Sequence, residues 1–308
     1  MSGLRAAAAD YLALRHALGF KMERPAPLLH QFVAFMEQMG ASTVTTELAV
    51  AWAKQPAAGH AYWWGYRMMV VRGFARHLQT LDPRTEVPPP DLLPRPPLRA
   101  TPYLYSEADI VSLMNATDAL CPALRAATYR TLVGLLVVTG MRIGEVIRLD
   151  SNDLDWTNGL LTVRDSKFGK SREIPLHPST VEALESYVRL RDKRWPRPVA
   201  PSFFVSMAGT RLLHSSIHHT FHGLVRQAGL QRRSASCRPR LHDLRHTFAV
   251  RTLLDWYRAG LDVEVQMPRL STYLGHVEPR NTYWYLSATP ELLALAGQRL
   301  EHAWERLG

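Results

Sequence analysis

The chain has 308 residues, and its lysines and arginines outnumber its aspartates and glutamates by 37 to 27, a formal net charge of +10. This length suits two domains of ordinary size, and the excess of positive charge indicates a polyanionic partner, usually nucleic acid. The two cysteines, Cys121 and Cys237, lie far apart in the sequence and form no pair with metal-ligand spacing, so nothing indicates a disulfide framework or a zinc ribbon.

The N-terminal part is predicted to be a small helical bundle over residues 1–81. Apolar residues recur at three- and four-residue spacings in ADYLALRHALGF, LLHQFVAFMEQM and YWWGYRMMVVRGFARHLQ, and TELAVAWA forms a shorter helix between them. Asp10 and Arg15 interrupt the first apolar stretch, which fits neither a signal peptide nor a membrane span. We therefore expect a soluble, cytoplasmic protein without a membrane partner.

Residues 82–102, DPRTEVPPPDLLPRPPLRATP, are dense in proline and have no helical or strand period. Proline removes backbone donors and breaks regular structure, so we expect an extended linker here. The linker divides the bundle from a second domain, residues 103–308.

The second domain is predicted to be mainly helical with one small antiparallel sheet. Ser106 followed by acidic residues indicates the start of a helix, and the long apolar segment ALRAATYRTLVGLLVVTG should form a core helix that ends at Gly140. The segments GLLTVRD and REIPL flank SKFGKS, a pattern typical of a β-hairpin with Lys167 near its tip. Residues from Pro178 onward return to helical patterns, and the last segment, TPELLALAGQRLEHAWERL, is an amphipathic helix.

Six polar residues in this domain suggest phosphoryl transfer. Arginine forks bind phosphate oxygens bidentately, lysine and histidine move protons, and a phenol can carry a phosphoryl group covalently. They stand in TGMRIGEV, DSKFGKSR, LHDLRHTFA, YLGH and PRNTYWYLS, and are Arg142, Lys167, His242, Arg245, His276 and Tyr285.

This ordered series resembles the tyrosine recombinase (phage integrase) family over roughly residues 103–290. The resemblance implies a site-specific DNA recombinase that cuts and rejoins DNA through a 3′-phosphotyrosine. It further implies that Arg142 and Arg245 clamp the phosphate, that Lys167 protonates the leaving 5′-oxygen, and that His242 and His276 assist. Tyr285 is then the nucleophile, because the family places that residue nine positions after the histidine of YLGH.

Several assignments stay open on the sequence. Lys170 lies close enough to Lys167 to replace it, and Tyr283 is a competing nucleophile two residues before Tyr285. Glu145 lies one helical turn after Arg142 and can brace its guanidinium. His246 is expected to be structural.

No cofactor and no metal is expected, since guanidinium and imidazole groups can stabilise the charge that magnesium stabilises in nucleases. Three histidines at successive i+4 positions would align on a helix, but they have no carboxylate or thiolate at a matching position. A helix side that faces DNA or solvent is the preferred interpretation of His214, His218 and His222.

The resemblance also implies partners. It predicts a two-domain clamp around double-stranded DNA with inverted half-sites, with a dimer bound to one site and a tetramer in the synapse. The expected location is the bacterial nucleoid. A companion recombinase and an accessory DNA-bending protein are further candidate partners. Two other functions share the same residues or ancestry: a type IB topoisomerase that relaxes DNA, and a non-catalytic regulator derived from an integrase. The bundle would contribute basic side chains to the clamp, among them Arg5, Arg15, Lys21, Arg24, Arg67, Arg72 and Arg76.

Overall fold

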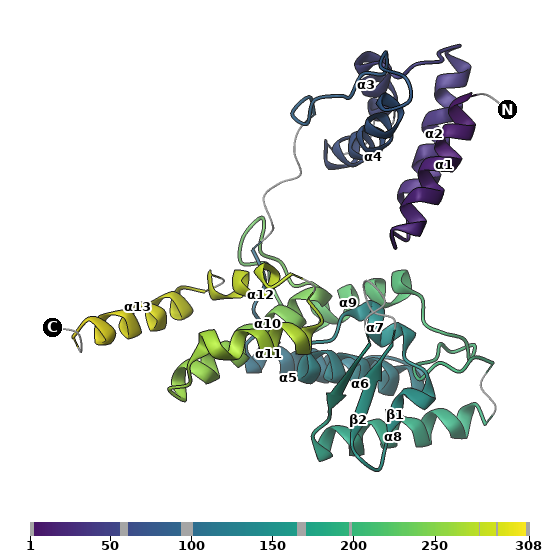
Figure 1. The fold of residues 1–308 in the computed structure, drawn as a ribbon. Coiled ribbons are helices and arrows are strands. Elements are labelled where there is room, and N and C mark those ends of the chain that lie inside the picture. The colour runs from purple at the N-terminus through teal and green to yellow at the C-terminus, as the bar shows by residue number, and fades with distance from the viewer. Residues whose placement is uncertain are drawn as a thin grey trace. The chain divides into compact units, whose positions relative to one another are not determined.

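The computed structural model describes residues 3–55, 61–93, 101–164, 171–196, 199–276, 278–287 and 289–305, without the side chains of residues 61, 287 and 299–305. The chain divides into two compact units, Met1–Arg99 and Ala100–Gly308. The helices labelled α1, α2, α3 and α4 in Figure 1 belong to the first unit, and the remaining described elements belong to the second.

The first unit is a bundle of helices around an aromatic core. Phe32 and Trp52 meet edge to face, with ring centroids 5.2 Å apart, and both are almost fully buried. Thr45 caps its helix by accepting a hydrogen bond from the backbone N–H of Leu48, as a threonine at an N-cap does. The helices are α1 (Gly3–Ala17), α2 (Pro25–Gln38), α3 (Thr46–Lys54) and α4 (Ala61–Gln79).

The first unit extends beyond residue 81, the limit predicted from the sequence. Arg72 donates to the backbone carbonyls of Pro88 and Pro89 at 2.8 and 2.9 Å, and Leu93 is 5% exposed within the core of this unit. Residues 82–93 therefore pack against the bundle instead of forming a free linker. Proline supplies no N–H donor, but its carbonyl still accepts, which is how this segment is held.

The second unit is mainly helical and contains a three-stranded antiparallel sheet of order β1-β2-β3. The strands are β1 (Leu154–Asp155), β2 (Leu160–Val163) and β3 (Arg172–Pro175), and Leu161 of β2 pairs with Ile174 of β3. The predicted hairpin and the predicted fold class are confirmed, whereas the short strand β1 was missed, because two residues carry no readable period.

The helices of the second unit follow the sequence pattern closely. Ser106 and Asp109 form a capping box at the start of α5, and α6 ends at Gly140, both as predicted. The α-helices are α5 (Glu107–Ala116), α6 (Ala123–Thr139), α7 (Ile143–Arg148), α8 (Pro178–Arg194), α9 (His214–Gln227), α10 (Leu241–Arg258), α11 (Val263–Leu274), α12 (Arg280–Tyr283) and α13 (Pro290–Glu305). Short 3₁₀ turns cover Thr117–Ala119, Ser151–Asp153 and Trp284–Ser287, the last labelled η3 here.

Helix α6 lies in the centre of the second unit and is in contact with α8 and α10. Gly140 ends it in the left-handed conformation, with φ of 60°, and a Cβ at this position would come within 2.5 Å of the Phe248 ring on α10. Only glycine allows the two helices to meet so closely here. This contact brings the start of α7 next to α10, where the candidate site lies.

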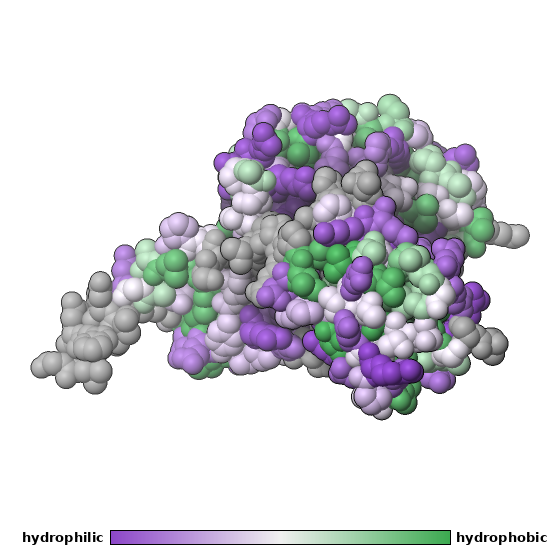
Figure 2. Space-filling model, turned by 90° about the horizontal axis from the view of Figure 1, so that it is seen from above, coloured by the Kyte–Doolittle hydropathy of each residue, from purple (hydrophilic) through white to green (hydrophobic). Residues whose placement is uncertain are grey.

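The last helix, α13, extends away from the rest of the second unit in Figure 1. Leu292 in its first turns is buried, and Arg258 of α10 forms an ion pair with Glu291 at 2.7 Å. Figure 2 shows hydrophobic residues beside hydrophilic ones on this projecting segment. The predicted amphipathic helix is present, and its first part packs against its own chain.

Candidate active site

Arg142 lies at the N-terminal end of α7, directly after the close contact of α6 with α10. Its backbone N–H donates to Glu145 Oε2 at 2.9 Å, and its Nη1 donates to Glu145 Oε1 at 2.8 Å. Its Nη2 donates to the backbone carbonyl of Gly275 at 3.0 Å. The predicted brace between Arg142 and Glu145 is present, and it orients a guanidinium that is still 27% exposed.

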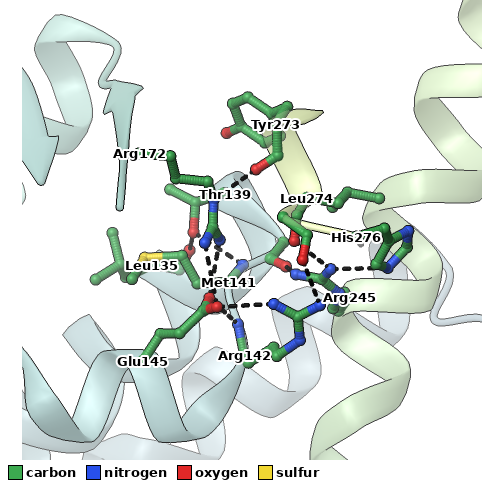
Figure 3. Close-up of polar contacts among 12 residues, drawn as sticks. Leu135, Thr139, Met141, Arg142, Glu145, Arg172, Arg245, Tyr273, Leu274 and His276 are labelled. Carbon is green, nitrogen blue, oxygen red and sulfur yellow. Dashed lines mark hydrogen bonds and ion pairs between the residues drawn. The ribbon is translucent and has the colours of Figure 1, made fainter. Parts of the chain in front are cut away.

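Arg245 projects from α10 and is 2% exposed. It donates to the carbonyl of Gly140 at 2.8 Å and to the carbonyl of Leu274 at 2.6 Å, and its Nη2 lies 3.0 Å from Nε2 of His276 (Figure 3). Burial, together with the nearby charge of Arg142, lowers the pKa of Arg245 to about 10. The site therefore holds a buried cation that an anionic ligand would stabilise.

His276 follows α11 at a left-handed Gly275, with φ of 66°. A guanidinium only donates, so the contact with Arg245 uses the lone pair of Nε2 and leaves the ring proton on Nδ1. Nδ1 lies 2.6 Å from Oγ1 of the buried Thr282, which accepts that proton. The imidazole is thus held between the arginine and the helix that precedes Tyr285.

Glu145 holds a second arginine that the sequence reasoning did not identify. Arg172, at the start of β3, donates to both carboxylate oxygens of Glu145 at 3.1 and 2.9 Å. Burial by itself would raise the pKa of Glu145, but hydrogen bonds from Arg172 and from the Arg142 backbone, with the charges of both arginines, lower it to about 2. The sequence signal for Arg172 was only a single arginine at the start of the short strand REIP.

The two candidate nucleophiles differ in their surroundings. Tyr285 is 2% exposed, and its ring stacks near that of His276, with centroids 6.1 Å apart. Tyr283 is 44% exposed. Trp284 and His246 also lie against Tyr285, at centroid distances of 5.5 and 5.4 Å. The 3₁₀ turn η3 therefore directs Tyr285 toward the arginine cluster, by which we mean Arg142, Arg172 and Arg245.

His242 stands one helical turn before His246 on α10, with ring centroids 4.7 Å apart. His242 is exposed, whereas His246 is buried and packs against the ring of Trp284, as expected for a structural residue. Lys167 and its rival Lys170 lie outside the described residues. The described part of the site therefore consists of four predicted residues in mutual proximity, with His242 at its margin.

Three of the histidines of α9, namely His214, His218 and His222, follow one another at i+4 spacing along that helix. The rings of His214 and His218 are 4.5 Å apart, and burial together with the charges of His214 and His222 lowers the pKa of His218. Within the described ranges, no group of three or more histidine, cysteine or acidic side chains is arranged to hold a metal ion.

The charges of the site are unbalanced. Arg142 and Arg172 both pair with the carboxylate of Glu145, and the third guanidinium, that of the buried Arg245, donates to backbone carbonyls, so positive charge is in excess among these described groups. Such an arrangement can bind a phosphodiester and stabilise the additional negative charge that develops during attack at phosphorus.

Several basic residues of the first unit are engaged internally. Arg67 is 5% exposed, with its guanidinium 3.6 Å from the Trp52 ring centroid and donating to the Trp52 carbonyl, and Arg5 pairs with Glu37 at 2.6 Å. Arg67 therefore cannot contact DNA as expected, because burial has made it part of the core. Exposed cations of this unit include Lys21, Arg24 and Arg76.

No helix in the described part of the chain has the length and apolar character needed to cross a membrane.

Known proteins resemble this chain over most of its length. The model of the "Phage integrase family" matches residues 104–291. The chain is 45% identical over 311 residues to the putative integrase/recombinase y4rB of Sinorhizobium fredii, covering 99% of each, and 27% identical to the tyrosine recombinase XerC of Pelotomaculum thermopropionicum, covering 86% of this chain and 78% of that protein.

Among solved structures, the Tn1549 transposon integrase in complex with transposon right end DNA aligns with a TM-score of 0.66 and 18% identity, over 96% of this chain and 98% of that one. At this identity the likeness shows a common fold. The family match and the relative at 45% identity go further: the chain belongs to the phage integrase family and is a site-specific tyrosine recombinase, an enzyme that cleaves and rejoins DNA.

Proposed function

We propose that this recombinase cleaves DNA with Tyr285 and forms a 3′-phosphotyrosine intermediate. The observation that carries the proposal is the chain of contacts from the buried Arg245 through His276 to the ring of Tyr285. A phenol, an imidazole and a guanidinium in this order supply a nucleophile beside the groups that would bind the scissile phosphate. Tyr283 is 44% exposed, whereas Tyr285 is 2% exposed.

In the proposed reaction, Oη of Tyr285 attacks the phosphorus atom, the Oη–P bond forms and the bond to the 5′-oxygen breaks. The phenol proton of Tyr285 passes to an imidazole of the site, that of His242 or His276. Arg142 and Arg245 bind the non-bridging oxygens, whose negative charge increases in the transition state. Lys167 donates the proton that the leaving 5′-oxygen requires, a role carried over from the family resemblance. Rejoining is the reverse reaction, in which a 5′-hydroxyl attacks the phosphotyrosine and releases Tyr285.

The excess positive charge supports this role for the arginines. Burying Arg245 near Arg142 is unfavourable in the free protein, as the lowered pKa of Arg245 indicates. A bound phosphodiester would offset that cost, and the more negative transition state would offset it further. Removing one such donor typically costs about 3 kcal/mol of transition-state stabilisation.

For its partner we propose double-stranded DNA with inverted half-sites, bound by a dimer on one site and by a tetramer in the synapse. The net charge of +10 supports a DNA partner. Similar solved structures include XerH bound to its difH substrate and the Tn1549 integrase with circular intermediate DNA. We propose that the protein acts at the bacterial nucleoid, with a companion recombinase or a DNA-bending protein as further candidate partners.

The test uses short nicked duplexes tiled across the DNA that flanks the gene, since a nick beside the cleavage point lets the cut fragment diffuse away and traps the covalent adduct. The wild-type protein should yield an adduct that survives denaturing electrophoresis, and peptide mapping should place the DNA on Tyr285. Tyr285→Phe should abolish the adduct and the matched control Tyr283→Phe should retain it. An adduct that persists in Tyr285→Phe and disappears in Tyr283→Phe would overturn the assignment.

A further inference from the structure

Three consecutive backbone carbonyls at the end of α11 each accept a hydrogen bond from a different arginine. Tyr273 accepts from Nε of Arg172 at 2.7 Å, and Leu274 accepts from Arg245 at 2.6 Å. Gly275 accepts from Arg142 at 3.0 Å. We call these three carbonyls the carbonyl triplet, and Figure 3 labels two of its residues, Tyr273 and Leu274, near the three arginines. A shift of this backbone segment would therefore move all three arginines.

Arg172 contacts this segment and the carboxylate of Glu145 at the same time. Oε1 of Glu145 accepts from Nη1 of both Arg142 and Arg172, while Oε2 accepts from the backbone N–H of Arg142 and from Nη2 of Arg172. The guanidiniums of Arg142 and Arg172 thus bind the same carboxylate, that of Glu145. The bidentate geometry requires the planar fork of an arginine, which a lysine does not have.

The side chain of Arg172 points inward. It is 10% exposed, compared with 27% for Arg142, and each of its three nitrogens donates to a protein acceptor. A third cation in a cluster that already has excess positive charge is unfavourable unless its contacts compensate. The partners of Arg172 are Glu145, which also binds Arg142, and the carbonyl of Tyr273, which lies in the segment that binds Arg245 and precedes His276.

We propose that Arg172 is a positioning residue for DNA cleavage: it sets the Arg142 guanidinium through Glu145 and sets the carbonyl triplet through Tyr273. The inference rests on the proposed function of the site. Arg172 does not bind the phosphate in this scheme. It holds the two phosphate-binding arginines at the separation that the scissile phosphate requires, and small misplacements of such groups can cost about a hundredfold in rate.

The first test measures single-turnover cleavage of the nicked duplex by the full chain, at saturating protein. Arg172→Gln should lower the cleavage rate by about 100-fold and change DNA affinity by less than about twofold. Arg172→Lys, which keeps the charge and loses the fork, should still lose at least about 10-fold. It also keeps the test valid if Arg172→Gln fails to fold.

The matched control is Arg191→Gln. Arg191 on α8 is 5% exposed and likewise joins a carboxylate and a carbonyl, those of Asp192 and Phe203, but it lies away from the arginine cluster. The Arg191→Gln variant should lose as much melting temperature as the Arg172 variants, but it should cleave at nearly the wild-type rate. Equal cleavage defects in both positions, after correction for the folded fraction, would overturn the inference.

A second substrate separates phosphate binding from proton donation. A duplex with sulfur in place of the bridging 5′-oxygen has a leaving group that needs no proton donor. This substrate should therefore restore the cleavage rate of the Lys167→Ala variant. Arg172→Gln should stay slow on this substrate, because its defect lies in the arginine cluster. Restoration of the cleavage rate of Arg172→Gln would show that Arg172 acts through Lys167 of the hairpin and would overturn the inference. Absence of any adduct with the wild-type protein would instead contradict the proposed function.

Discussion

Gly275 lies so close to Arg172 that a Cβ on the glycine would stand 2.9 Å from Nη1 of the arginine. The same atom would lie 3.5 Å from Nη1 of Arg142. Backbone and guanidiniums can approach to this degree only because the residue before His276 has no side chain. The left-handed φ of 66° at Gly275 adds a second reason for glycine at this position.

Gly275→Ala should therefore impair cleavage beyond its effect on stability. An alanine in the left-handed region costs about 1–2 kcal/mol, and its methyl group would displace the two arginines. Gly229→Ala is the matched control, because Gly229 has φ of 69° and nothing within 4 Å of a Cβ. We expect similar losses in melting temperature and a rate loss of about 10-fold or more in Gly275→Ala alone. Equal rates in the two variants would contradict the close packing around Gly275.

Alanine at Arg142 or Arg245 should slow cleavage much more than it weakens DNA binding. Each residue makes one of many expected phosphate contacts, but both would act on the scissile phosphate, where charge increases in the transition state. The expected rate loss is about 100-fold or more, with a small change in Kd. Single-turnover rates and titrations on the same duplex measure the two quantities. A binding defect that accounts for the whole rate loss would place these arginines elsewhere on the DNA.

Glu145→Gln should lower stability at neutral pH, and the difference from wild type should vanish in acid. The pKa of Glu145 falls from 4.5 to about 2 on folding, so its contribution is fully present above pH 4.5 and is lost as the pH falls toward 2. This shift corresponds to about 3 kcal/mol. Denaturant unfolding across this pH range provides the measurement.

Glu185→Gln serves as the control for that series, since Glu185 is half-exposed and pairs with Arg189 at 3.5 Å on the surface of α8. An exposed pair contributes less than about 1 kcal/mol. A wild-type advantage over Glu145→Gln that stayed constant from pH 7 to pH 2 would show that the carboxylate is not held as an anion.

The two units should bind DNA more tightly when joined than when separated. The connection raises the effective concentration of the second unit once the first has bound. Cutting the chain before Pro96 gives two pieces, each expected to bind weakly and with a shallower dependence on salt than the intact protein. Titrations of all three species at several salt concentrations test this. If residues 96–308 alone bind as tightly as the whole chain, with the same salt slope, the clamp proposal fails.

Helix limits, the hairpin and the fold class could be predicted because their signals are local. Ser106 caps α5, Gly140 ends α6 and the strands on either side of residues 165–170 pair as expected. Arg142 and Glu145 are one helical turn apart, so their contact also follows from spacing alone. The family motifs are local patterns of the same kind.

The role of Arg172 could not be predicted, because its partners are remote in the sequence. Glu145 lies 27 positions away and Tyr273 lies 101 positions away. The segment of residues 82–93 gave a similar difficulty, since prolines suggested a linker while Arg72 and Leu93 hold it on the first unit. Arg67 was counted as a surface cation although it packs on Trp52.

The sequence by itself determined which residue types this protein brings to DNA, in which order and on which elements, because periodicity, caps and motif spacing are properties of neighbouring residues. Only the tertiary structure decided how they meet. Two tyrosines two positions apart are equivalent to a spacing argument, yet the turn η3 buries Tyr285 against His276 and leaves Tyr283 exposed. The carbonyl triplet likewise exists only because α6, α7, α10, α11 and β3 pack together, and packing between distant segments is not written in any local pattern.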